Sequence, residues 1–208
     1  MQISNDCYFL DRQRHDLALR MIRHEARTCT IRTCTGLTDD RIRRLYKTFT
    51  HHEAHIEVRR HRGKSPRQAS YFTRSTRMQF EASCLGNVFA AFDLLQTTSG
   101  ADELEYGERF CDAYETHRQL VQGPRISFEH AWFLLNLLSR GATLHANRCR
   151  HCSSRYLRDR FSATRRRCPF CELKAYEPMC IGRPARRSPA RKSRRTAANA
   201  HRRVTASA

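Results

Sequence analysis

Four cysteines in two close pairs are the residues of this 208-residue chain whose types and spacing best suit chemistry. Cys149 and Cys152 form one Cys-x-x-Cys pair, and after fifteen intervening residues Cys168 and Cys171 form a second. Two such pairs can bring four thiolates around one ion, so the spacing predicts one structural, tetrahedral Zn2+ per chain. Four protein ligands leave no open position for water or substrate, which argues against a catalytic metal. An iron–sulfur cluster uses the same ligands, and spacing alone does not exclude it.

The remaining cysteines are scattered along the chain, several of them within helical patterns. The sequence has no positively charged leader followed by a short apolar stretch, so it predicts a cytoplasmic protein in which disulfides are disfavoured. A redox pair of the thioredoxin type would need a βαβ context, which is absent around the paired cysteines. We therefore expect small buried hydrophobic side chains rather than ligands at Cys7, Cys29, Cys34, Cys84, Cys111 and Cys180.

Arginine surrounds the cysteine pairs and dominates the charge of the chain. The formal net charge is +19 at pH 7, and a surface of that sign attracts polyanions by releasing their counterions. A loop fixed by zinc would hold guanidinium groups in place and so lower the entropy cost of binding phosphates. The predicted DNA contacts in this region are Arg150, Arg155, Arg158, Arg165, Arg166 and Arg167. The alternative is a solvated basic face that merely accompanies the metal.

A second candidate for DNA contact is a helix-turn-helix over residues 27–47. Gly36 falls in the predicted turn, Thr38 can cap the second helix, and Arg41, Arg43 and Arg44 follow on that helix. Two acidic residues occupy its first turn, where they would face phosphates. A helical hairpin used for packing or subunit contact is therefore the alternative.

Helical periodicity dominates the chain before the cysteine pairs. Apolar residues recur at helical spacing in segments 16–28, 80–95, 103–121 and 127–139, and a further helix is predicted from about Thr38. Gly141 is placed to end the last of these helices. Segments 80–95 and 127–139 have more apolar surface than one small body needs, which suggests an obligate partner. The sequence thus predicts a mainly α fold.

Composition divides the chain into three parts. Residues 1–145 are predicted to form a helical body with the partner and DNA contacts, and residues 146–180 a four-cysteine zinc module. The module is predicted to be turn-rich with little to make a core, so metal binding would supply much of its folding free energy. From Arg183 onward the chain has no acidic residue and few large apolar groups, so residues 181–208 are predicted to be a disordered basic tail.

Nothing in the sequence indicates catalysis or a membrane span. His51 and His55 stand four residues apart, but Glu53 is displaced from the position that a zincin motif requires. A phosphate-binding loop, a nucleophile elbow and a dinucleotide fingerprint are also absent. The most apolar segment, residues 131–138, is far shorter than the roughly 20 residues that cross a bilayer. We therefore predict a protein that is not an enzyme and does not contact a membrane.

Several motifs, taken in order, resemble the FlhC family of bacterial flagellar transcription regulators. They are Thr35-Gly36-Leu37-Thr38 followed by Arg41-Ile42-Arg43-Arg44-Leu45-Tyr46, Arg62-Gly63-Lys64-Ser65-Pro66 leading into Tyr71-Phe72, the segment 77–84 with Glu81-Ala82-Ser83, the Ala131-Trp132 helix, and the cysteine quartet. Together these motifs cover roughly residues 15–175. Many zinc proteins share the quartet alone, so the ordered set is the more specific evidence.

The resemblance implies a function, a cofactor and partners. Proteins of the FlhC family hold one zinc ion through four cysteines and pair with FlhD, four FlhD subunits with two FlhC subunits. The assembly binds promoters of flagellar operons and recruits RNA polymerase. The resemblance therefore predicts a DNA-binding subunit of a hetero-oligomeric transcription activator, with an FlhD-type subunit, promoter DNA and RNA polymerase as partners. Two alternatives stay open: a zinc-ribbon RNA-binding protein without promoter specificity, and a diverged regulator of non-flagellar genes.

Overall fold

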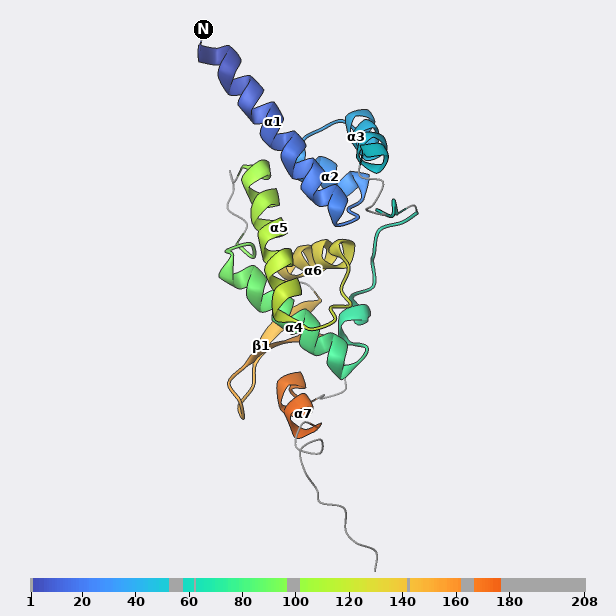
Figure 1. Cartoon of the computed structure of the whole chain (residues 1–208). Coiled ribbons are helices and arrows are strands. Elements are labelled where there is room, and N and C mark those ends of the chain that lie inside the picture. Colours follow the sequence, from blue (N-terminus) through green and yellow to red (C-terminus); the bar gives the residue numbers. More distant parts are fainter. Residues whose placement is uncertain are drawn as a thin grey trace, which may run out of the picture.

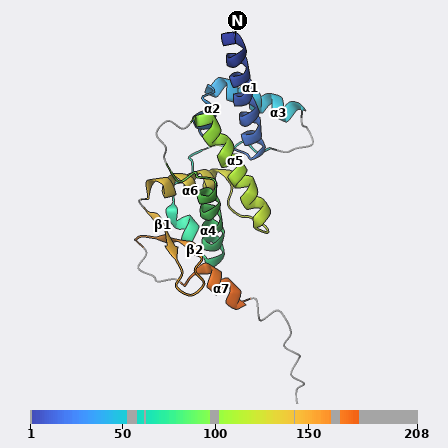
Figure 2. The same cartoon turned by 90° about the vertical axis from the view of Figure 1, so that its left-hand side faces the viewer.

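The computed structural model describes residues 2–52, 58–61, 63–96, 102–141, 143–161 and 167–176. Within these residues the chain is mainly helical and elongated, as Figure 1 and Figure 2 show. One end of the molecule holds the three N-terminal helices, and the other holds a two-stranded hairpin and the last helix. The predicted mainly α fold is confirmed.

The helix α4 lies at the centre of the described elements. In chain order these are α1 (Gln2–Arg23), α2 (Thr28–Thr35), α3 (Asp39–His52), the short 3-10 helix η1 (Ala69–Thr73), α4 (Thr76–Ala91), α5 (Glu103–Leu120), α6 (Phe128–Arg140), β1 (Leu144–Arg148), β2 (Arg155–Asp159) and α7 (Pro169–Tyr176). α4 contacts α5, α6, β2 and α7, while α1 and α2 both pack on α5. The hairpin and α7 both pack on α4, and η1 and α6 make further contacts with the hairpin.

Local signals explain the bounds of α4. The Ser75 side chain accepts a hydrogen bond from Met78 N at 3.2 Å, which caps the first turn. The helix ends at Ala91, earlier than the predicted segment 80–95, because Asp93 adopts a left-handed φ of 53°. Because apolar residues continue at helical spacing past Asp93, the sequence pattern did not show where α4 ends.

The other helices follow their predicted segments to different degrees. α5 and α6 match segments 103–121 and 127–139 within one residue at each end, and Gly141 ends α6 with a φ of 61°. Thr38 caps α3 as predicted, since its hydroxyl accepts from Arg41 N at 3.4 Å. The helix predicted over residues 16–28 has the wrong bounds at both ends, because α1 begins at Gln2 and a turn at residues 24–27 separates it from α2.

The main core forms between α4, α5 and α6. Phe89 on α4 and Phe110 on α5 are fully buried, with ring centroids 5.9 Å apart. Leu85 is also fully buried, so the prediction that segment 80–95 leaves apolar surface for a partner is wrong. Its apolar face is covered within the chain by α5, α6 and β2. The exposed large apolar side chains include Tyr8 and Phe9 on α1, which are 67% and 59% exposed.

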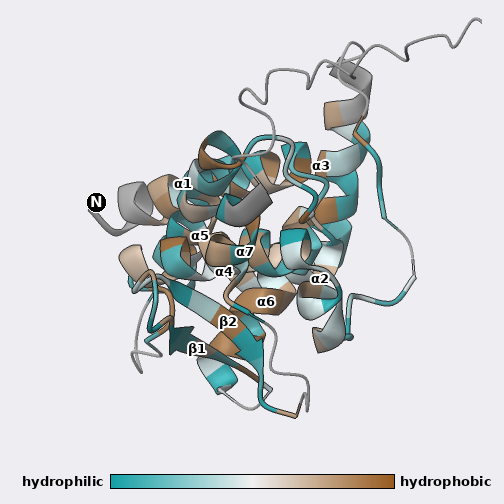
Figure 3. Ribbon diagram, turned by 90° about the horizontal axis from the view of Figure 1, so that it is seen from below, coloured by the Kyte–Doolittle hydropathy of each residue, from teal (hydrophilic) through white to brown (hydrophobic). Residues whose placement is uncertain are grey.

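The hairpin is a structural feature that the sequence did not predict. β1 and β2 pair antiparallel from Leu144↔Asp159 to Arg148↔Arg155. Leu144 and Leu157 are buried and belong to the main core, so the expectation of a module with little to make a core is corrected. Apolar residues are few here, but the hairpin packs them against the helical body. Seen from below in Figure 3, the hairpin and α7 lie on the same side of the molecule.

Candidate metal centre and cationic hairpin

The four predicted cysteine ligands meet at one place in the structure. Their Sγ atoms all lie within 4.8 Å of one another. Cys149 Sγ lies 3.7 Å from Cys171 Sγ, and Cys152 Sγ lies 3.7 Å from Cys168 Sγ. A tetrahedral ion with metal–sulfur bonds of about 2.3 Å has sulfur–sulfur edges of about 3.8 Å. Four thiolates at these distances could therefore hold one metal ion.

The first cysteine pair is held by a tight turn that follows β1. Cys149 N donates to Ser154 O at 3.0 Å, and Ser153 N donates to Cys149 O at 2.9 Å. Ser153 closes this turn with a left-handed φ of 58°. His151 N lies 3.4 Å from Cys149 Sγ, so a backbone donor faces the sulfur. The turn thus prepares this pair for the thiolate form.

The second cysteine pair lies at the start of α7. Pro169 occupies the first helical position, where its missing N–H costs no helical hydrogen bond. Glu172 N donates to Cys168 O at 3.0 Å, which places the first sulfur just before the helix. The Phe170 ring packs edge-on against Phe80 of α4, with centroids 5.0 Å apart. α4 therefore supports the second pair as well as the hairpin.

Hydrogen bonds give the thiols different affinities for protons. The backbone N–H groups of Cys152 and His151 lower the pKa of Cys149. The Ser154 hydroxyl and N–H lower the pKa of Cys152 to about 6. The neighbouring Cys152 sulfur raises the pKa of Cys171 to about 12. Since a metal needs thiolates, its binding would release a proton from Cys171, and metal affinity should fall as the pH falls.

The arginines predicted to contact DNA lie on or next to the hairpin. Arg150 in the turn, Arg155 at the start of β2 and Arg167 before the second cysteine pair are exposed, and Arg158 is half-buried. Within the described part of the chain, none of these four guanidinium groups forms an ion pair with a carboxylate. The hairpin therefore presents positive charge that no carboxylate of the described residues pairs with.

The predicted helix-turn-helix corresponds to α2 and α3, but most of its arginines have internal partners. Arg41 donates two hydrogen bonds, of 3.0 and 2.9 Å, to the Asp11 carboxylate of α1. Arg43 donates to Asp40 at 2.7 Å. Arg44 is exposed. The Arg41–Asp11 pair joins α3 to α1, which agrees with the packing alternative for this helical pair.

Several predicted features lie outside the described residues. They are Arg165, Arg166, Cys180, the basic tail over residues 181–208, and the side chains of His51 and His55.

The scattered cysteines divide into buried and exposed residues. Cys34 and Cys111 are buried, as predicted, and Cys84 is half-buried. Cys7 and Cys29 are exposed, so the prediction of burial is wrong for these two. Cys7 lies on α1 and Cys29 on α2, where the Cys29 Sγ lies 3.7 Å from Ser65 Oγ. Helical spacing alone did not reveal which side of α1 or α2 faces solvent.

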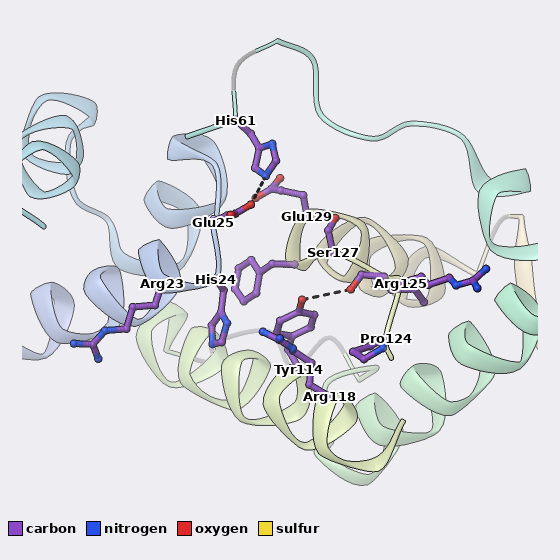
Figure 4. Close-up of a pocket in the computed structure, with 12 residues that line it drawn as sticks. Arg23, His24, Glu25, His61, Tyr114, Arg118, Pro124, Arg125, Ser127 and Glu129 are labelled. Atoms are coloured by element: carbon purple, nitrogen blue, oxygen red, sulfur yellow. Dashed lines mark hydrogen bonds and ion pairs between the residues drawn. The ribbon is translucent and has the colours of Figure 1, made fainter. Parts of the chain in front are cut away.

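A separate pocket of about 330 Å³ lies between the end of α1, α5 and the start of α6, as Figure 4 shows. Glu25 forms an ion pair with His61 there at 2.8 Å. The buried Glu129 carboxylate accepts from Arg27 N at 2.7 Å and so supports the start of α2. Both carboxylates of the pocket are thus engaged in contacts that hold chain segments together.

Sequence analysis missed the polar residues that support the metal centre. Ser153 and Ser154 follow the first cysteine pair directly, and a serine pair in that place was a signal for a turn. Gln79, Ser83 and Asn87 are spaced four residues apart on α4. That spacing was a signal that one stripe of α4 contacts polar groups.

The helical fold, the cysteine cluster and the order of the motifs point to one family. Over residues 4–179, the chain matches the family described as the flagellar transcriptional activator (FlhC). The chain belongs to the FlhC family. No curated protein matches it. The FlhC family is one of transcription regulators rather than enzymes. Among the described helices of this FlhC-family chain, none has both the length and the apolar character to cross a membrane.

Proposed function

We propose that this FlhC-family chain is the DNA-binding subunit of a hetero-oligomeric transcription activator of flagellar operons. The observation that supports this proposal most directly is the cluster of four Sγ atoms, within 4.8 Å of one another, at the turn of an exposed cationic hairpin. In the proposal, residues 1–145 form the helical body, residues 146–180 the zinc module and residues 181–208 a basic tail.

One structural Zn2+ per chain is the proposed occupant of the cysteine cluster. Four thiolates at the corners of a tetrahedron suit zinc, and they leave no open coordination position. When bound, the ion cross-links the turn after β1 to the start of α7. The ligands in this proposal are Cys149, Cys152, Cys168 and Cys171.

The proposed DNA contacts are guanidinium groups that bind phosphates. Arginines on a fixed backbone lose less conformational entropy on binding than those on a mobile loop. On the zinc module they are Arg150, Arg155, Arg158, Arg165, Arg166 and Arg167, and on α3 they are Arg41, Arg43 and Arg44. The uncompensated charge of the hairpin favours the first group over the second.

The proposed partners are an FlhD-type subunit, in a complex of four such subunits with two of this chain, promoter DNA and RNA polymerase, in the cytoplasm. Tyr8, Phe9 and Leu10 expose 67%, 59% and 37% of their surface on neighbouring positions of α1. Adjacent exposed apolar side chains of this kind are more often covered in an assembly than left in water. These side chains support a partner contact at α1, whereas the sequence alone favoured a partner contact at segments 80–95 and 127–139.

Footprinting on a flagellar promoter tests the proposal. The full chain would be purified with and without an FlhD-type subunit, before and after removal of metal by a chelator. We expect protection of a defined promoter segment only with both subunits and metal present. Metal analysis of the same preparation should give one zinc per chain. Protection that persists after complete metal removal would contradict the structural role of zinc.

Paired variants separate DNA contact from overall charge. Replacement of Arg155 and Arg158 by alanine should weaken promoter binding and reduce the salt slope of binding by about 0.9 for each lost phosphate contact. Replacement of Arg32 on α2 and Arg118 on α5 by alanine removes two exposed arginines outside the hairpin and is the control. Equal effects of the two changes would exclude a specific hairpin contact. Tighter binding to RNA than to promoter DNA would favour the alternative of an RNA-binding protein. Protection of only non-flagellar promoters would favour the alternative of a diverged regulator.

A further inference from the structure

Three polar side chains of α4 bind the outer edge of β2. Leu157 N donates to Ser83 Oγ at 2.9 Å, and Gln79 Nε2 donates to Leu157 O at 2.8 Å. One turn further along α4, Asn87 Nδ2 donates to Arg155 O at 3.0 Å. β1 pairs with the opposite edge of β2, so α4 occupies the place of a third strand.

The match between helix and strand follows from their repeats. Residues four apart on a helix are separated by about 6 Å along its axis, and residues two apart on a strand by about 6.7 Å. Gln79, Ser83 and Asn87 are four residues apart, and Leu157 and Arg155 are two apart. Ser83 and Asn87 therefore meet successive outward-facing residues of β2, and Gln79, one turn before Ser83, binds the carbonyl of the same Leu157.

A close approach of the two elements makes these hydrogen bonds possible. Gly86 lies on α4 next to this polar stripe, and a Cβ atom built on it would lie 3.4 Å from Leu157 Cδ1. The same Cβ would lie 3.3 Å from Leu138 Cδ1 of α6. A glycine here gives the hairpin room to pack its leucine against the helix without displacing α6.

We propose that Gln79, Ser83 and Asn87 are positioning residues that set the orientation of the cationic hairpin against the helical body, independently of the metal. The metal joins the turn after β1 to α7, whereas α4 holds the strand that leads away from that turn. Asn87 binds the carbonyl of Arg155 itself, so the backbone of a proposed DNA-contacting residue is fixed by α4. This inference rests on the proposed function, because the consequence of the orientation is promoter affinity.

Variants that remove a donor while keeping the size of the side chain test the inference. Gln79→Glu and Asn87→Asp each replace an N–H donor by an oxygen facing a carbonyl. In the full chain with its FlhD-type partner, each should weaken promoter binding about five- to tenfold, as expected for one lost hydrogen bond. Zinc content should stay at one per chain. Hydrogen exchange at the strand residues 155–159 should become faster.

A conservative change and a neighbouring change are the controls. Asn87→Gln keeps the amide donor and should restore most of the affinity that Asn87→Asp loses. Ala91→Ser alters an exposed position one turn further along α4 and should leave both affinity and exchange unchanged. A merely destabilised protein would instead lose zinc or unfold at lower temperature in step with its loss of affinity, and that pattern would overturn the proposal.

Removal of the metal is an independent test of the proposal. After chelation, residues 149–154 should exchange faster while residues 155–159 keep their protection, because α4 still binds the strand. Loss of protection in both segments would overturn the proposal. If the unaltered protein binds no promoter DNA, the proposed function fails, and the exchange measurements on Gln79→Glu and Asn87→Asp alone decide whether α4 orients the hairpin.

Discussion

The buried carboxylate of Glu81 accepts a hydrogen bond of 2.7 Å from the backbone N–H of Ile126, and so ties α4 to the turn before α6. The same Oε1 atom accepts from Arg125 N at 2.7 Å. The turn contains Gly123 and Pro124, and its carbonyls accept hydrogen bonds from Arg77 of α4, at Gln122 O (2.6 Å), and from Tyr114 of α5, at Ile126 O (3.4 Å). Glu81 thus accepts from the two N–H groups where the chain enters α6, while other side chains bind the carbonyls of the same turn.

Glu81→Ala should lower the free energy of unfolding by about 2–3 kcal/mol, because one buried and one part-buried N–H group lose their carboxylate acceptor. Urea denaturation of the metal-loaded protein measures this change. Glu81→Gln keeps an oxygen acceptor and should cost less. Glu108→Ala, at an exposed position of α5, is the control. A difference below about 0.5 kcal/mol between Glu81→Ala and this control would show that the turn is held by other contacts.

Gly107 on α5 should not tolerate a larger side chain. A Cβ atom at this position would lie 2.8 Å from Cys34 Cβ and 2.8 Å from Leu17 Cδ2, so α2 and α1 would have to move. Helix propensity alone favours alanine over glycine by about 1 kcal/mol. We expect Gly107→Ala to destabilise the protein by about 1–3 kcal/mol despite that gain. Thermal unfolding decides the sign, and a raised midpoint would show that the helices have room to separate.

Glu115 should make stability depend on pH in the acid range. Arg20 donates to both of its carboxylate oxygens, at 2.9 and 2.6 Å, and His24 lies 2.7 Å from one of them. The Arg20 hydrogen bonds, and after them that of His24, lower the pKa of Glu115 from 4.5 to about 2. This contribution is fully present above pH 4.5 and is lost as the pH falls towards 2.

Glu115→Gln should therefore be less stable than the unaltered protein at neutral pH, and the difference should shrink between pH 4.5 and 2. Unfolding midpoints measured across this range test the prediction. Both proteins release metal in acid, so the difference between them isolates the carboxylate. Glu105→Gln, whose side chain is 66% exposed, should show no such trend. A constant difference across the range would show that Glu115 is not ionised against Arg20 in the folded state.

Cysteine labelling should reveal three classes of thiol. Cys7 and Cys29 are exposed and should react first with an alkylating reagent. Burial raises the pKa of Cys34 and raises that of Cys111 to about 12, so both should react only on unfolding. The four ligand cysteines should be protected while metal is bound and become reactive after chelation. Peptide mapping by mass spectrometry identifies the sites, and full reactivity of the quartet before chelation would contradict metal binding.

The sequence alone determined the features that depend on neighbouring residues. The spacing of the two cysteine pairs predicted the cluster, because the two cysteines of each pair are only three positions apart in the chain. Helical periodicity and caps predicted α5, α6 and the start of α3, since a helix forms hydrogen bonds only within its own segment. The ordered motifs predicted the FlhC family, which the match over residues 4–179 confirms.

Tertiary structure alone decided which elements the zinc module contacts and which charges stay free. The outer edge of β2 binds Ser83, which lies 74 residues from Leu157 in the chain. Arg41 is engaged because folding brings Asp11 of another helix within 2.9 Å of its guanidinium. The exposure of Cys29 and the low pKa of Glu115 likewise depend on which distant segments pack nearby. Such contacts join residues far apart in the chain, and no local pattern of spacing or composition encodes them.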